Sequence, residues 1–196
     1  EQDYIVEGDW SGAAFLLVAG AIAGSFQVTE LDPDSSQADR SILLALQQSG
    51  ASLEIEGQTI SCSKAELKAF KLDAIHCPDL FPPLVALAAH CEGVSQISGV
   101  NRLIHKESNR ADALLNEMKK LGIELTISGD EMFIKGKAEI QQSSIDSHND
   151  HRIAMAAAIV ALPGKVPIEI LEADCINKSY PDFYTDLIKV GGKIHE

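Results

Sequence analysis

The sequence predicts an α+β (mixed α/β) fold in which one helix-and-strand unit occurs about three times around a pseudo-threefold axis. Three apolar runs without Asp, Glu, Lys or Arg are each closed by a glycine, and these glycines lie 69 and 71 residues apart, at Gly24, Gly93 and Gly164. A period near seventy residues is too long for a solenoid repeat, and three copies are too few for a propeller. The units are therefore expected to pack around an axis.

The apolar runs predict three buried helices, at residues 12–22, 80–91 and 153–162. Glycine after the last apolar residue is the usual signal for a helix C-terminus. These helices are apolar all round rather than along one stripe, which is typical of helices in the interior of a domain. We expect all three to lie inside, with strands around them.

Each closing glycine is followed by a segment with period-two alternation, which favours a strand. The predicted strands are residues 26–31, 94–98 and 166–170. A polar loop then leads to a second helix that ends in glycine, and these helices are predicted at residues 37–49, 109–121 and 182–190. Two hairpins follow, joined by glycine-containing turns: residues 52–55 with 58–62, and 123–127 with 131–135.

The third unit has no room for a hairpin before Glu196, and the first residue is not Met. We therefore expect a single domain, 1–196, of three units (about 8–77, 78–147 and 148–196), cut from a longer chain. Residues 4–6 are expected to add one more strand. The rest of the longer chain is expected to supply the strands that complete the third unit.

Composition limits the function classes. The chain has 16 Lys and Arg against 29 Asp and Glu, a net charge of −13, which argues against nucleic-acid and membrane-surface partners. It contains no secretory leader and no apolar span of about twenty residues, so we expect a cytoplasmic protein. The four cysteines are widely spaced and predict buried free thiols. His148 and His151 have no further ligand nearby in the sequence, so no metal site is predicted.

Polar clusters precede the apolar helices, and three equivalent helix starts would gather at one end of the domain. Free backbone N–H groups at a helix start favour anions, and the fork of Arg152 in Asn149-Asp150-His151-Arg152 suits phosphate or carboxylate. The alternative is that Asn149 or Asp150 only caps the helix. Asp79, after Pro78, is likewise either a capping carboxylate or a general base.

Two further loops carry candidate charges. Lys106-Glu107-Ser108-Asn109-Arg110 opens a second helix, and its cations, four residues apart, would share a helix face around one carboxylate. The alternative is a solvated, charged helix start. Lys178 opens the corresponding loop of the third unit and is uninformative by itself. Arg40, 70 residues before Arg110, is interpreted as structural.

With these residues in view, the chain resembles the C-terminal half of the 5-enolpyruvylshikimate-3-phosphate (EPSP) synthase family. The resemblance runs from Val6-Glu7-Gly8-Asp9 to Lys178-Ser179-Tyr180-Pro181-Asp182-Phe183, and its most specific part is Asn149-Asp150-His151-Arg152-Ile153-Ala154-Met155. It implies an enolpyruvyl-transferase fold with two domains of three βαβαββ units each and ligands in the cleft between them. It also implies transfer of the enolpyruvyl group of phosphoenolpyruvate to the 5-hydroxyl of shikimate 3-phosphate, without metal or cofactor.

The resemblance implies a role for each candidate residue. Asp79 corresponds to the carboxylate that takes the proton of the substrate hydroxyl, and Glu107 to the group that protonates the methylene carbon. The residues that correspond to ligand contacts are Arg110, Arg152 and Lys178 for phosphoenolpyruvate, Lys106 for shikimate 3-phosphate, and His151 as polar support.

The sequence departs from the family at Asn109, where Asp is usual, at residues 100–105, and at Trp10, where a small residue is common. Two alternatives remain open. One is UDP-N-acetylglucosamine enolpyruvyl transferase, which shares the fold but lacks the Asn-Asp-His-Arg stretch and relies on a cysteine in its other domain. The other is a non-catalytic anion-binding domain of the same fold. In either case, a chain without the second domain is expected to hold half a site and to be inactive alone.

Overall fold

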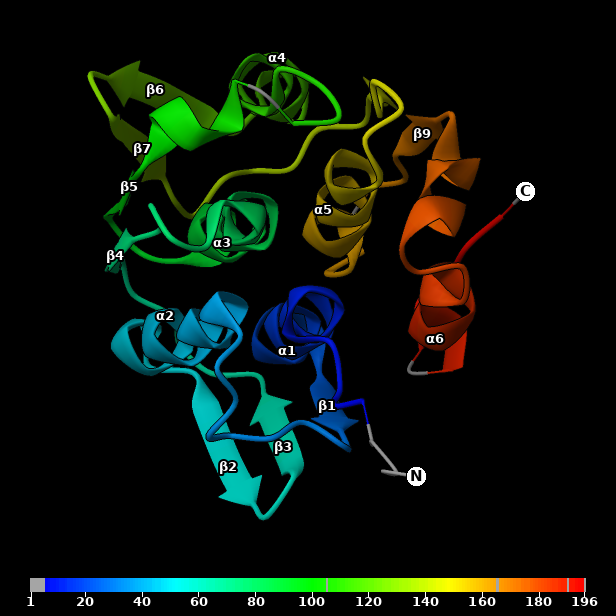
Figure 1. Cartoon of the computed structure of the whole chain (residues 1–196). Coiled ribbons are helices and arrows are strands. Elements are labelled where there is room, and N and C mark those ends of the chain that lie inside the picture. The colour runs from blue at the N-terminus through cyan, green and yellow to red at the C-terminus, as the bar shows by residue number, and fades with distance from the viewer. Residues whose placement is uncertain (1–5, 105, 165, 190, 196) are drawn as a thin grey trace, which may run out of the picture.

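A computed structural model describes residues 6–104, 106–164, 166–189 and 191–195. Three helices lie together in the interior, with the strands outside them (Figure 1): α1 (Trp10–Ala23), α3 (Phe81–His90) and α5 (His151–Ala161). Each of the three contacts the other two. The predicted mixed α/β fold with apolar helices inside is confirmed.

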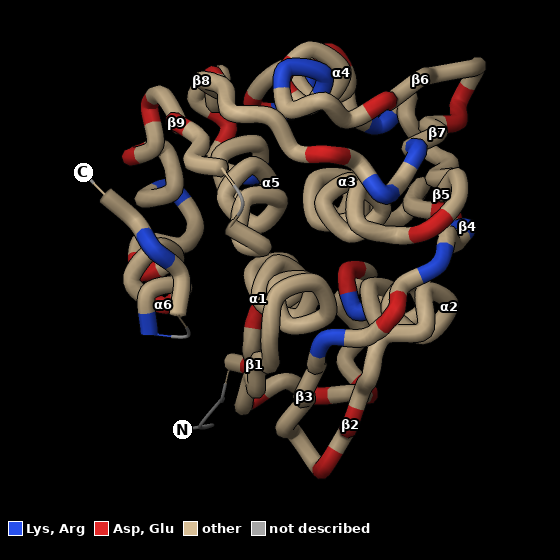
Figure 2. The backbone as a smooth tube through the Cα atoms, turned by 180° about the vertical axis from the view of Figure 1, so that it is seen from behind, with Lys and Arg blue, Asp and Glu red and all other residues tan. Residues whose placement is uncertain are grey.

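Helix α1 shows why these segments are buried helices. Asp9 caps it, and its carboxylate accepts hydrogen bonds from the backbone N–H groups of Ser11 and Gly12. The residues from Ala13 to Ile22 are then buried on every side of the helix. The backbone tubes of α1 and α3 carry no acidic or basic colour along their length (Figure 2). With no polar face to turn toward water, such helices are stabilised by placing their whole surface in the core.

The first sheet packs closely on α1. It contains β1 (Ser25–Val28), β3 (Thr59–Ser63) and β2 (Ser52–Glu56) in that order, all antiparallel. A β-carbon on Gly20 would lie 2.3 Å from the carbonyl oxygen of Cys62, so only glycine allows β3 to approach the helix this closely. The strand predicted at residues 26–31 ends earlier than expected, at Val28.

The second helix of the first unit begins with a 3₁₀ turn, Ala38–Ser41, and continues as α2 (Ile42–Ser49). Gly50 ends it in the left-handed conformation, with φ of 81°. The predicted helix at residues 37–49 is therefore confirmed, with its first turn wound more tightly than an α-helix.

The second unit contains every strand of a βαβαββ unit. Its elements are β4 (Lys71–Asp73), α3 after the 3₁₀ turn Pro78–Leu80, β5 (Val94–Ser98), α4 (Arg110–Lys120), β6 (Glu124–Ser128) and β7 (Glu131–Lys135). The sheet order is β4-β5-β7-β6, with β4 parallel to β5 and the other pairs antiparallel. The hairpin and helix α4 are where the sequence predicts them, whereas β4 is not predicted.

The third unit contains β8 (Ser144–Asp146), α5, β9 (Glu169–Leu171) and α6 (Phe183–Lys189), with a 3₁₀ helix at Ala173–Lys178 before α6. Strand β8, which the sequence does not predict, pairs in parallel with β9. Strand β9 begins three residues later than the predicted 166–170. Of the predicted strand at 4–6, only Val6 is described, and it is exposed and outside any strand.

Candidate active site

The start of α5 is formed by the Asn149-Asp150-His151-Arg152 stretch. Asp150 caps the helix, and its Oδ1 accepts a hydrogen bond of 3.0 Å from the backbone N–H of Arg152. His148 and Asn149 precede the cap with φ of 51° and 55°, so the chain enters the helix through two successive left-handed residues. The predicted helix start is confirmed, and the capping role of Asp150 is only part of what this carboxylate does.

Arg110, the first residue of α4, is fully buried and surrounded by carboxylates. It donates from Nε to Oδ2 of Asp150 at 2.9 Å, from Nη2 to Oδ1 of Asp150 at 3.1 Å, and from Nη1 to Oδ1 of Asp79 at 2.7 Å. Its Nη2 also donates to Glu107. Burying a guanidinium is unfavourable unless it is paired and hydrogen-bonded, and these three carboxylates provide the pairing.

Asp79 stands where several cations meet. Lys106 Nζ lies 2.9 Å from its Oδ1, and Arg152 Nη2 lies 3.5 Å from its Oδ2, in addition to Arg110. Burial acts to raise the pKa of Asp79, but Arg152, Lys106 and Arg110 outweigh it and lower this pKa to about 2. Asp79 is therefore an ionised carboxylate that shares three positive charges.

The side chain of Glu107 is more exposed than that of Asp79. Its side chain is 40% exposed, and among the described residues its ion-pair partner is Arg110. The neighbouring Ser108 donates from Oγ to Oδ2 of Asp150 at 3.1 Å, which fixes the backbone beside Glu107. The carboxyl group of Glu107 thus stays exposed, while the backbone next to it is held in place.

Lys178 and His151 complete the predicted set. Lys178 Nζ donates to the carbonyl oxygen of Asn149 at 2.8 Å, so the third unit's loop reaches the start of α5. His151 is buried, and neither ring nitrogen has a hydrogen-bond partner among the described residues. Burial and then the charge of Arg152 lower the pKa of His151. Buried polar atoms are usually hydrogen-bonded, so these two nitrogens are exceptions among the described residues.

The structure thus brings all seven predicted site residues to the starts of α3, α4 and α5. Asp150 as the main partner of Arg110 is not predicted, because the two residues lie 40 positions apart in the sequence.

Asp39, in the first unit, also lies close to these residues. Burial raises its pKa, its carboxylate accepts a hydrogen bond from Ser11, and the charge of Arg152 acts on it. Arg40, by contrast, is exposed and donates to the carbonyl oxygen of Pro33.

Within the described residues there is no group of three or more His, Cys, Asp or Glu side chains that could hold a metal ion. All four cysteines are buried and free, as predicted. Burial raises the pKa of Cys62 and of Cys91 to about 12, so these thiols are neutral. No described helix has the length and apolar character needed to cross a membrane.

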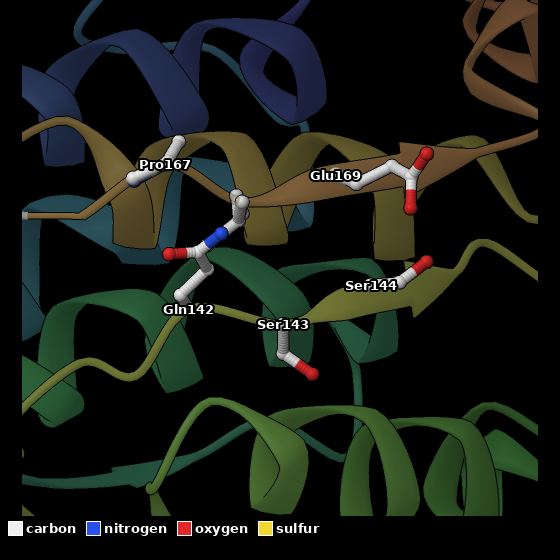
Figure 3. Close-up of a pocket in the computed structure, with 6 residues that line it drawn as sticks. Gln142, Ser143, Ser144, Pro167 and Glu169 are labelled. Carbon is white, nitrogen blue, oxygen red and sulfur yellow. The ribbon is translucent and has the colours of Figure 1, made fainter.

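A pocket of about 620 Å³ lies elsewhere, at the beginnings of β8 and β9. Figure 3 shows Gln142 and Ser143 just before β8 with Ser144 at its start, and Pro167 just before β9 with Glu169 at its start. Its lining contains a carboxylate and, among the described residues, no lysine or arginine, so it does not suit an anionic ligand. The cations stand beyond the other ends of these parallel strands.

Comparison with known proteins identifies the family. The family model for EPSP synthase (3-phosphoshikimate 1-carboxyvinyltransferase) matches residues 1–187. The chain belongs to the EPSP synthase family. The 3-phosphoshikimate 1-carboxyvinyltransferase of Clostridium novyi strain NT is 39% identical over 195 residues, and that of Dehalococcoides mccartyi strain 195 is 41% identical over 192 residues. The matches cover 100% and 97% of this chain but 45% of each relative.

Solved structures agree with the assignment to the EPSP synthase family. An EPSP synthase from Acinetobacter baumannii matches 97% of this chain and 47% of its own, with a TM-score of 0.83 and 27% identity. The enolpyruvyl transferase NikO from Streptomyces tendae matches 98% of this chain and 45% of its own, with a TM-score of 0.76 and 18% identity, which shows a shared fold. The chain therefore spans about half the length of the EPSP synthases that it matches.

Proposed function

We propose that this chain, as part of a longer cytoplasmic protein, transfers the enolpyruvyl group of phosphoenolpyruvate to the 5-hydroxyl of shikimate 3-phosphate and releases phosphate. The observation that carries the proposal is the arrangement around buried Arg110, which contacts both Asp79 and Glu107. Two carboxylates on one fixed guanidinium, beside further cations, suit proton transfer to and from an anionic substrate.

Binding of phosphoenolpyruvate is assigned to Arg110, Arg152 and Lys178. The ligand carries a carboxylate and a phosphate, which match planar guanidinium groups and the free N–H groups at the start of α5. The same cations stabilise negative charge that develops as phosphate leaves. His151, with unpartnered ring nitrogens in the described structure, adds polar support, and Lys106 is assigned to shikimate 3-phosphate.

Asp79 is assigned to the substrate hydroxyl. With a pKa of about 2 it is a weak base before the substrates bind. An anion that draws Arg110 and Arg152 toward itself removes part of the positive charge from Asp79 and raises its pKa. The hydroxyl proton then passes to Asp79 as the hydroxyl oxygen forms a bond to carbon 2 of phosphoenolpyruvate.

Glu107 is assigned to carbon 3 of phosphoenolpyruvate. It delivers a proton to this carbon during addition. In the elimination step Glu107 takes a proton back from carbon 3, the double bond re-forms, and the bond from carbon 2 to the phosphate oxygen breaks. The proton held by Asp79 passes to the leaving phosphate, which restores the carboxylate of Asp79. Atoms and charges balance without a metal or a redox cofactor.

The half of the relatives' length that this chain does not span is assigned the remaining phosphate contacts and the opposite wall of the cleft.

Two departures from the family pattern, at Trp10 and Asn109, are accounted for by contacts within the fold. Trp10 is buried, and its Nε1–H donates to the carbonyl oxygen of Asp32, so it is a packing residue. The side chain of Asn109 donates to Asp112 at 2.6 Å on the exposed side of α4. Neither residue therefore favours a non-catalytic domain.

Glu107→Ala tests the proposal. The chain is titrated with phosphoenolpyruvate and shikimate 3-phosphate while backbone amide signals are followed by NMR, and phosphate release is then assayed after the second half is added as a separate chain. We expect local shifts at Asp79, Arg110 and Arg152, turnover only in the reconstituted protein, and a loss of about a thousandfold or more for Glu107→Ala. Glu124→Ala, an exposed carboxylate paired with Lys135, is the matched control.

Unchanged turnover in Glu107→Ala would contradict the role of Glu107 alone. Absence of both shifts and turnover with a folded partner half would contradict the assignment of the whole set of residues. A reconstituted protein that transfers enolpyruvate to UDP-N-acetylglucosamine instead would replace the acceptor substrate in the proposal.

A further inference from the structure

Glu117 is a buried carboxylate on α4, outside the set of residues assigned above. Its side chain is 3% exposed. Oε2 accepts hydrogen bonds from the backbone N–H of Asp146 at 2.9 Å and from Lys120 Nζ at 2.6 Å, and Oε1 lies 3.1 Å from Nε2 of His148. Burial acts to raise the pKa of Glu117, but Lys120, the Asp146 amide and His148 lower it overall. Glu117 is therefore an ionised group tied to the turn before α5.

The turn that Glu117 holds is conformationally unfavourable. His148 and Asn149 both have positive φ, which places the β-carbon of an L residue close to its own backbone. Two local hydrogen bonds support the turn: the His148 N–H donates to Asp146 Oδ1 at 2.7 Å, and the Asn149 N–H donates to Ser147 Oγ at 3.2 Å. Such conformations persist where surrounding contacts hold them.

One helix holds this turn from both sides. Arg110 and Glu117 are seven residues apart on α4, so they lie on the same face, about two helical turns apart. Arg110 binds Asp150, immediately after the turn, while Glu117 binds Asp146 and His148 within it. The position of the start of α5 is thereby set by α4.

We infer that Glu117 is a positioning residue for the anion site: together with His148 it keeps residues 146–149 in the left-handed turn that places Asp150 and Arg152. The carbonyl oxygen of Asn149 in this turn also accepts the hydrogen bond of Lys178, so the turn sets the position of two cations. The inference deepens the proposed function and rests on it for the identity of the anion. The conformation of the turn itself does not depend on it.

The first test uses the chain without added substrate. We expect Glu117→Ala to shift the backbone amide signals of residues 146–152 and to speed hydrogen exchange at the Asp146 amide by about tenfold or more. Glu124→Ala should leave these signals in place. Glu117→Gln keeps the size but not the charge, and it serves as the test variant if the alanine variant folds poorly. It should shift the same signals in the same direction by a smaller amount. Unmoved signals in both Glu117 variants would overturn the inference.

Glycine provides a rescue. Asn149→Gly removes the β-carbon that disfavours positive φ, so the turn should persist with less support from Glu117. We expect Glu117→Ala combined with Asn149→Gly to return the signals of residues 150–152 toward their original positions. A double variant that keeps the shifts of Glu117→Ala would argue against a role through the turn.

The second test is affinity for phosphoenolpyruvate, measured well below the melting temperature. Glu117→Ala should weaken binding about tenfold, with partial recovery in the glycine double variant, while Glu124→Ala stays within about twofold. A lower melting temperature with unchanged affinity would reduce Glu117 to a stabilising residue and overturn its positioning role. If the unaltered chain binds no phosphoenolpyruvate, the proposed function fails for the isolated chain, and the amide signals still decide the role of Glu117 in the turn.

Discussion

Arg40 and Arg110 occupy corresponding places in the first two units, 70 residues apart, yet their surroundings differ completely. Arg40 lies in a 3₁₀ turn, is exposed, and donates to one backbone carbonyl. Arg110 begins α4, is fully buried, and binds Asp79, Glu107 and Asp150. The repeat therefore reproduces the helices and strands but not the charged side chains. The ion pairs around Arg110 are formed by residues of the second and third units.

The largest expected effect separates these two arginines. Arg110→Ala leaves three carboxylates facing one another without their shared cation, which should lower the free energy of unfolding by about 3–5 kcal/mol. Arg40→Ala removes an exposed contact and should change it by at most about 0.5 kcal/mol. Urea denaturation of both variants measures the difference. Similar losses would mean that the two positions are energetically equivalent despite their different surroundings.

The helix caps give the next effect. Asp150→Asn places an amide N–H₂ against the donors of Arg110 or Arg152 and removes a buried charge, which should lower the free energy of unfolding by about 3 kcal/mol. Asp9→Asn at the start of α1 should be nearly neutral, because Asn is also a good N-cap and Asp9 is exposed. Thermal unfolding checks both variants. Equal losses would show that Asp150 acts only as a cap.

The smallest effect depends on pH. The pKa of Asp79 is lowered from its ordinary value of 3.8 to about 2, so its ionised form stabilises the folded state above the unfolded-state value. This contribution, about 2 kcal/mol, should be present at neutral pH and lost as the pH falls from about 4 to about 2. The difference in unfolding free energy between the unaltered chain and Asp79→Asn, followed from pH 5 to pH 2, measures it. A difference that stays constant over this range would contradict the ion pairing of Asp79.

The helices were predictable because their signals are local. Apolar runs of ten or more residues, closed by glycine, define α1, α3 and α5 whatever surrounds them. Strands β4 and β8 were missed because each is three residues long and contains one apolar residue, Leu72 or Ile145. A period-two pattern needs more residues than that. Both become strands through pairing with β5 and β9, which lie more than twenty residues further along the chain.

The candidate residues could be named from the family resemblance, and the structure brings them together, but the contacts among them could not be predicted. No local pattern indicates that Arg110 binds Asp150 or that Glu117 binds His148, because these pairs are formed by folding and are 40 and 31 residues apart. The residue pattern around Asp79 left it open between a cap and a base. The structure places it among three cations, while its chemical role stays a prediction.

The ion pairs of the site have a consequence for how a ligand arrives. Lys106, Arg110, Arg152 and Lys178 stand beside Asp79, Glu107 and Asp150, so the cluster is close to electrical neutrality on a chain whose net charge is −13. Such a cluster projects little positive potential into solution, so at low salt the net charge of this chain repels an approaching dianion. Added salt screens this repulsion, because the Debye length falls to about 10 Å at 0.1 M. Under the proposed function, we therefore expect capture of the anion to be a short-range event whose association rate rises with added salt.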